Sequence, residues 1–216
     1  MGDTTEIRLT PDQALQLLSE GNQRFASGAP EHPRASGERR DALACGEPAP
    51  VATVIGCADS RAPLELLFDC GVGDLFAVRI AGNVCTPEVL ASVEFGVLYQ
   101  CTPLCVVLGH TQCLAVTSAL AGARLAGTIP ELLARIAPAA QRTRAAQPME
   151  APAQLAELAI RENIWLTIEG LLAGSAELRK QALIGKLRLE GALYRLEDGL
   201  VEWLGAHPRE AVLLAG

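Results

Sequence analysis

The chain has 216 residues, half of them hydrophobic and only 4% aromatic, which is typical of one globular domain with an aliphatic core. A formal net charge of −7, with no basic cluster interleaved with aromatic residues, argues against binding to nucleic acid. The sequence shows no secretory signal and no apolar run of membrane-spanning length, and seven irregularly spaced cysteines suit a reducing compartment, so we expect a soluble cytoplasmic protein.

The first 50 residues predict an arm that precedes the main domain. Thr10, Pro11 and Asp12 favour the start of a helix, and the apolar residues that follow, up to Phe25, recur at helical spacing. Residues 28–50 are rich in proline and charge and predict an extended segment. We therefore expect residues 1–50 to form a helical arm with an extended segment that packs on a partner subunit, and residues 51–216 to form the main α/β core.

Three short apolar runs predict the strands of a buried sheet. Residues 51–55, 75–80 and 104–108 are rich in β-branched or aliphatic side chains, as buried parallel strands are. Residues 87–99, between the last two runs, carry apolar residues at helical spacing. Because a helix that joins two strands makes a crossover, the sheet is predicted to be parallel.

The second half of the chain adds helices and a final hairpin. Helices are predicted over residues 114–125 and 154–172, with a proline-punctuated stretch over 130–152 between them. Residues 186–196 and 200–204 resemble strands joined by a short turn, which predicts a hairpin. The expected fold class is α/β: a central, mostly parallel β-sheet flanked by helices, with an N-terminal helical arm and a C-terminal edge strand or hairpin.

Five polar or sulfur-bearing residues follow two of the predicted strands. Cys57, Asp59 and Arg61 come after the first strand, while His110 and Cys113 come after residues 104–109. Functional groups of parallel α/β sheets gather at the carboxyl ends of strands, so neighbouring strands would bring these side chains together. Two thiolates and an imidazole suit zinc, and three ligands leave a fourth position for water or substrate. Taken alone, however, such a spacing also arises by chance, with the histidine simply packed.

Asp59 and Arg61 would shape the chemistry of such a site. Zinc lowers the pKa of a bound water toward about 7, which makes hydroxide available at neutral pH. Asp59 would accept the proton of that zinc-bound hydroxide in a hydrogen bond, and Arg61 would hold Asp59 through a bidentate contact. Asp59 is also a candidate for the fourth zinc ligand in a closed state. A plain helix cap before Ala62 is the structural alternative for this segment.

Several blocks of sequence, in one order, carry a resemblance to a known family. They are Cys57-Ala58-Asp59-Ser60-Arg61, Gly73-Asp74-Leu75-Phe76, Arg79, Ala81-Gly82-Asn83 and Gly109-His110-Thr111-Gln112-Cys113, with further matches at Gly21-Asn22-Gln23-Arg24-Phe25 and Val201-Glu202-Trp203-Leu204. On these residues, which extend over nearly the whole chain, the protein resembles the β-carbonic anhydrase family.

The resemblance implies an activity, a cofactor and an assembly. The zinc ligands would be Cys57, His110 and Cys113, and Asp59 with Arg61 would be the catalytic dyad. The reaction would be the reversible hydration of carbon dioxide to bicarbonate and a proton. The N-terminal helix would embrace a partner in a dimer, and dimers would pair further.

The substrate pocket implied by the resemblance is apolar, as suits a small, linear, uncharged gas. We expect Phe76, Ala81, Gly82, Phe95 and Leu114 to line it. For Phe76 and Phe95 the alternative from sequence alone is ordinary core packing.

Three positions depart from the family pattern. Pro48 stands where many members carry a glutamine that donates to substrate, Leu114 stands where glycine is usual, and Phe95 replaces a frequent tyrosine. These departures keep two alternatives open. One is a zinc hydrolase of carbonyl sulfide or carbon disulfide; the other is a weakly active or inactive homologue in which zinc is structural or bicarbonate is sensed.

Overall fold

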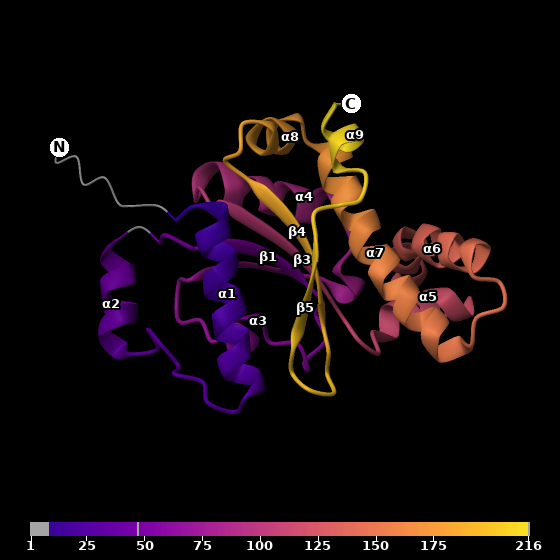
Figure 1. Ribbon diagram of the computed structural model, residues 1–216, viewed down its shortest axis with the longest axis horizontal. Helices are drawn as coiled ribbons and strands as arrows, with labels where there is room; N and C mark the ends of the chain where they lie inside the picture. The colour runs from indigo at the N-terminus through magenta and orange to yellow at the C-terminus, as the bar shows by residue number, and fades with distance from the viewer. Residues whose placement is uncertain (1–8, 47, 216) are drawn as a thin grey trace.

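The computed structural model describes residues 9–46 and 48–215 and contains one five-stranded sheet (Figure 1). The strands are β1 (Ala52–Gly56), β2 (Leu75–Arg79), β3 (Leu104–His110), β4 (Arg188–Tyr194) and β5 (Val201–Gly205), in the order β2-β1-β3-β4-β5. The first four strands pair in parallel, and β5 pairs antiparallel with β4 at the edge. This arrangement confirms the predicted α/β class with a mostly parallel sheet and a terminal hairpin.

Helices cover both faces of the sheet, which explains why the central strands β1 and β3 are buried throughout. The helices are α1 (Pro11–Ala26), α2 (Gly37–Cys45), α3 (Leu64–Leu67), α4 (Pro87–Glu94), α5 (Leu114–Ala121), α6 (Ile129–Ala146), α7 (Pro152–Gly174), α8 (Ala176–Leu183) and α9 (Glu210–Ala215). Alternate strand residues face opposite cores: Ile55 and Val107 pack in the cluster that includes α7, whereas Val54 and Val106 pack in the cluster that includes α1 and α3. No helix in the described part of the chain has the length and apolar character needed to cross a membrane.

Helix α1 begins where the sequence predicts and packs on the sheet of its own chain. The Thr10 hydroxyl accepts from the Gln13 backbone N–H at 3.2 Å, and the Gln13 side chain accepts from the Thr10 N–H at 2.8 Å, which makes a capping box. Leu18 is fully buried in the α1–α3 cluster. At Gly21 an added Cβ would lie 1.9 Å from the Phe68 carbonyl oxygen, so only glycine permits this close approach.

Asn22 joins α1 to two other parts of the chain. Its amide nitrogen donates to the carbonyls of Leu67 at 3.0 Å and Gly199 at 2.9 Å, and its oxygen accepts from the Val201 N–H at 2.8 Å. Asn22 itself is buried, as are its bonds to Leu67 and Val201, whereas its bond to Gly199 is partly buried. We expect Asn22→Ala to lower the free energy of unfolding by about 2–4 kcal/mol, because two buried backbone groups and one partly buried group lose their partner.

Urea unfolding monitored by circular dichroism measures this loss. Gln23→Ala, at an exposed neighbouring position of α1, is the matched control and should change stability by less than about 0.5 kcal/mol. Equal, small losses in both variants would show that Asn22 does not anchor α1 to the core.

Two expectations about proline-rich segments are wrong. Residues 28–50 are not simply extended, because they contain α2, whose Ser36 cap accepts from the Arg39 N–H at 3.3 Å. The prolines of that segment lie outside the helix. Similarly, the stretch 130–152 contains α6: Pro130 lies in the first turn, where the missing N–H is tolerated, and Pro138 lies inside the helix.

Two predicted helices also differ at their ends. Helix α4 continues into a π-helical turn at Phe95–Tyr99, so the predicted span 87–99 is helical throughout but irregular. Helix α5 stops at Ala121 rather than reaching residue 125, because Gly122 adopts a left-handed conformation with φ 64°.

Candidate metal centre

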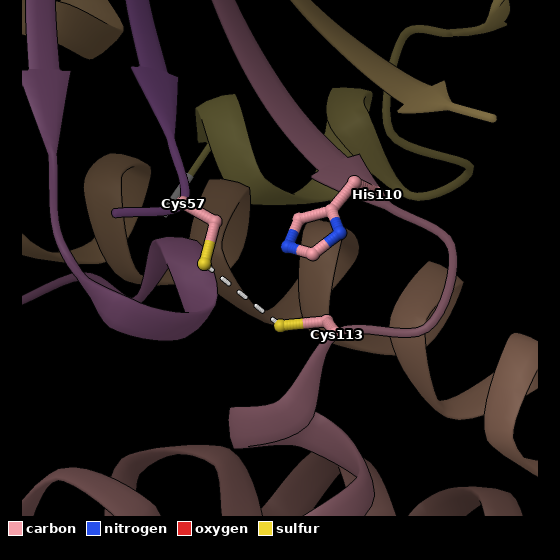
Figure 2. Close-up of side chains that lie close together, drawn as sticks. All are labelled: Cys57, His110 and Cys113. Carbon is pink, nitrogen blue, oxygen red and sulfur yellow. Dashed lines mark hydrogen bonds between the residues drawn. The ribbon is translucent and has the colours of Figure 1, made fainter. Parts of the chain in front are cut away.

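The sheet places the three predicted ligands at one point. Cys57 directly follows β1 and His110 is the last residue of β3; β1 and β3 are parallel neighbours with Gly56 opposite Leu108. Cys113 caps the N-terminus of α5, three residues after His110. Figure 2 shows the three side chains directed toward one another from these elements. The structure therefore brings together residues that lie more than 50 positions apart in the chain.

The separations of the donor atoms suit a tetrahedral metal site. One ligand atom from each residue lies within 4.8 Å of the others, and the two Sγ atoms are 3.9 Å apart. Two thiolates bound to zinc at about 2.3 Å in tetrahedral geometry lie about 3.8 Å from each other. All three side chains are buried.

His110 is oriented as a metal-binding histidine would be. Its Nδ1 lies 2.8 Å from the Thr111 carbonyl oxygen. Because a carbonyl oxygen only accepts, Nδ1 carries the hydrogen, and in the neutral ring Nε2 has a lone pair available for a metal. Nε2 is buried and has no hydrogen-bond partner among the described residues. Buried polar atoms are normally satisfied, and a metal ion bound by Cys57, His110 and Cys113 would satisfy this one.

The charges around the cluster favour a cation. The Gly82 N–H donates to Cys57 Sγ at 3.2 Å. The hydrogen bond with Cys113 lowers the pKa of Cys57, whereas that contact and burial raise the pKa of Cys113. Burial lowers the pKa of His110, but the nearby Cys57 side chain raises it on balance. A thiolate held in a buried site attracts a metal ion.

Asp59 lies beside the cluster and is held by Arg61. Arg61 donates from Nε to Asp59 Oδ1 at 3.0 Å and from Nη2 to Oδ2 at 2.7 Å, and its backbone N–H donates to Oδ1 at 2.9 Å. The Arg61 guanidinium holds the pKa of Asp59 well below its usual range. Asp59 Oδ2 is 3.9 Å from Nε2 of His110. Thus the carboxylate faces the donor atoms while its oxygens are bound by arginine.

Three residues that hold the site in place were assigned no function from the sequence, although Arg79 is among those that carry the family resemblance. Arg79 donates to the carbonyls of Cys57 at 3.0 Å and Asp59 at 2.7 Å. Asn163 and Thr167 of α7 donate to the carbonyls of the turn Ala81–Asn83, at 2.8 and 2.9 Å. The sequence contains one signal for two of them: Asn163 and Thr167 are polar residues four positions apart on the otherwise apolar, buried face of α7.

The predicted pocket residues fall into two groups. Ala81 and Gly82 form the turn that contacts Cys57; Gly82 has φ 70°, and a Cβ there would meet Ile136 at 2.6 Å. Phe76 stacks on Phe95 with ring centroids 6.1 Å apart, and Phe95 stacks on Tyr99 at 5.3 Å.

The aromatic stack and Leu114 reach the protein surface. Phe95 is half exposed, and Leu114, the first residue of α5, is 74% exposed. Leu114 therefore projects outward rather than over the donor atoms of its own chain. Pro48, also exposed, precedes β1.

A cavity borders the turn that joins His110 to Cys113. Its volume is about 360 Å³, and its wall includes Thr111, Gln112, Glu157, Ile160 and Glu197. None of the three clustered ligands lines it.

Comparisons with known proteins identify the family. The sequence model of the family described as carbonic anhydrase matches residues 52–201. Carbonic anhydrase 2 of Mycobacterium tuberculosis is 38% identical over 193 residues, which cover 88% of this chain and 90% of that protein. Among solved structures, the β-carbonic anhydrase CafA of Aspergillus fumigatus has a TM-score of 0.75 at 25% identity, covering 93% of this chain and 95% of that one. The β-carbonic anhydrase CcaA has a TM-score of 0.71 at 26% identity, covering 90% and 93%. The chain therefore belongs to the β-carbonic anhydrase family of enzymes.

Proposed function

We propose that this protein is a zinc-dependent carbonate dehydratase that hydrates carbon dioxide reversibly to bicarbonate and a proton. The observation that carries the proposal is the buried cluster of Cys57, His110 and Cys113, in which Nε2 of His110 has no other partner, beside Asp59. The names of the relatives, all carbonic anhydrases, support the same reaction.

The donor set supports zinc as the metal. Two thiolates and one imidazole disfavour hard cations such as Mg²⁺ and Ca²⁺, which prefer oxygen, and three protein ligands leave one position open. When bound, zinc supplies a Lewis acid that makes water nucleophilic near neutral pH.

Asp59 and Arg61 orient the reacting water rather than store its proton. Because Arg61 keeps the pKa of Asp59 low, Asp59 remains a carboxylate over the physiological pH range and only accepts hydrogen bonds. An accepted hydrogen bond from water fixes which lone pair faces the carbon atom of the substrate. A base this weak does not retain a proton at neutral pH, so the proton released on hydration passes to solvent or buffer.

We also propose self-association, as a dimer that pairs further. The exposed aromatic side chains Phe95 and Tyr99 support an interface there, because large apolar groups gather at contact surfaces. Helix α2 has no buried residue, which supports packing of this part of the arm on a partner. Phe76 and Phe95 would then form an apolar wall for carbon dioxide at the interface.

A reducing compartment such as the cytoplasm suits this site. Cys57 and Cys113 must be thiolates to bind metal, and all seven cysteines of the chain are free thiols.

The choice of gas is tested with purified zinc-loaded protein. We expect faster turnover of carbon dioxide than of carbonyl sulfide or carbon disulfide, because Asp59 and Arg61 are placed as the family resemblance implies for hydration. Stopped-flow hydration and sulfide release measure the rates. Faster turnover of either sulfur compound would make the protein a hydrolase of that gas. Stoichiometric zinc without hydration, even at alkaline pH, would favour a structural or sensing role instead.

A further inference from the structure

The two-residue turn that joins His110 to Cys113 has an unfavourable backbone. Gln112 adopts φ 58°, in the left-handed region that residues with a side chain rarely occupy. Thr111 and Gln112 determine how far Cys113 lies from His110 and in which direction it points. A strained turn between two metal ligands keeps its shape only if other contacts hold it.

Glu197, in the turn between β4 and β5, supplies such contacts from 85 positions away in the chain. Its Oε2 accepts from the Thr111 hydroxyl at 3.0 Å, and its Oε1 accepts from the Gln112 side-chain amide at 3.0 Å. Two backbone groups of the same hairpin also bond Thr111. The Leu196 N–H donates to the Thr111 hydroxyl oxygen at 3.0 Å, and the Thr111 N–H donates to the Tyr194 carbonyl at 2.9 Å.

The turn has room to move if Glu197 is removed. Thr111, Gln112 and Glu197 all border the cavity of about 360 Å³ described above. Tight packing therefore does not confine the side chain of Gln112, and the carboxylate is the group that fixes it. The turn also touches the Asp59–Arg61 pair, because Arg61 Nη2 donates to the Gln112 carbonyl at 3.3 Å.

We propose that Glu197 is a positioning residue for the metal centre: by binding Thr111 and Gln112 it fixes the separation and direction of His110 and Cys113. The inference rests on the proposed function, since it assumes that these two residues bind zinc. Glu197 touches neither substrate nor metal. Its effect reaches the chemistry through the shape of the turn.

The first test compares Glu197→Ala with Asp198→Ala, a matched truncation in the same hairpin. Asp198 bonds Arg195 and the Leu200 N–H, and no bond joins it to residues 110–113. We expect Glu197→Ala to release zinc to a chelator about 10–100-fold faster, the range typical of outer-shell contacts to metal ligands. Its kcat should fall about 10-fold with little change in KM. Asp198→Ala should stay within about 2-fold of wild type in each quantity.

Glu197→Gln separates geometry from charge. Its amide oxygen still accepts from Gln112, and its amide nitrogen can donate to the Thr111 hydroxyl oxygen, so this variant should stay within about 3-fold of wild type. Wild-type zinc release in Glu197→Ala would overturn the proposal, and so would equal losses in Glu197→Ala and Asp198→Ala.

A second measurement needs no metal. In zinc-free protein, Glu197→Ala should raise the rate of hydrogen exchange at the Thr111 amide about 10-fold, while Asp198→Ala should not. Unchanged exchange would overturn the claim that Glu197 holds the turn. If wild-type protein bound no zinc, the proposed function would fail, and exchange at Thr111 would still decide whether Glu197 holds this segment.

Discussion

His110→Ala is expected to abolish stoichiometric zinc binding and carbon dioxide hydration together. In the proposed site the imidazole is one of three protein ligands, and its Nε2 has no other partner among the described residues, so no other protein contact would replace it. Structural zinc sites bind with about 10–16 kcal/mol shared among four ligands, so the loss of one ligand, about 2.5–4 kcal/mol, lowers affinity about 10²–10³-fold. We expect kcat/KM to fall by at least about 10³-fold. Metal analysis and stopped-flow hydration on the same samples measure both.

The control for this variant is His32→Ala. His32 is exposed and lies in the segment before α2, so its replacement should leave zinc content and kcat/KM within about 2-fold of wild type. Full zinc content and full activity in His110→Ala would show that His110 does not bind the metal. Circular dichroism separates loss of ligand from loss of fold.

Arg61→Ala is expected to lower hydration about 100-fold while the protein keeps its zinc. Arg61 provides three of the hydrogen bonds that Asp59 accepts, and without the side chain only the backbone N–H remains. The released carboxylate lies 3.9 Å from Nε2 of His110, close enough to turn toward the metal. Stopped-flow hydration measures the rate, and zinc-edge X-ray absorption should show an added oxygen ligand.

Arg61→Lys is the matched variant, because it keeps the charge but not the planar fork that binds two oxygens. Its activity should lie between those of wild type and Arg61→Ala. Asp59→Asn should also keep zinc and lose about 10²-fold in rate. An amide is uncharged and has one acceptor oxygen, whereas a carboxylate is charged and has two. Wild-type rates in both Arg61→Ala and Asp59→Asn would show that this pair does not orient the reacting water.

The central sheet could be predicted because buried parallel strands leave a direct signal in the sequence. The runs that became β1, β2 and β3 are apolar on both faces, since helices cover both sides. The positions of Cys57 and His110 follow from the same reasoning, because residues that end adjacent parallel strands must be neighbours.

The effect of the prolines on helix boundaries was harder to predict. Helices α2 and α6 were missed because proline marks a segment as irregular when counted over a window, whereas its effect depends on its place in the helix. Pro130 stands in a first turn, where it is well tolerated. Periodicity likewise revealed the apolar face of α1 but not the surface it meets. In the described chain Leu18 packs in the cluster with α3 and the sheet, and Asn22 bonds Leu67 of α3 and Val201 of β5.

The supports of the site could not be read from the sequence. Glu197 acts on a turn 85 positions away, and Asn163 acts on Gly82 from 81 positions away. Such contacts exist only once the chain has folded, and an isolated glutamate in a hairpin looks like any exposed turn residue. By contrast, Cys57, His110 and Cys113 could be selected by chemistry, because few residue types bind zinc.

Zinc-edge X-ray absorption on wild-type protein, with metal content measured on the same sample, tests the metal site most directly. The account predicts one zinc per chain, bound by two sulfur atoms at about 2.3 Å and by nitrogen or oxygen atoms at about 2.0–2.1 Å. A protein that binds no stoichiometric zinc, or one whose zinc has only nitrogen and oxygen neighbours, would contradict the assignment of Cys57, His110 and Cys113.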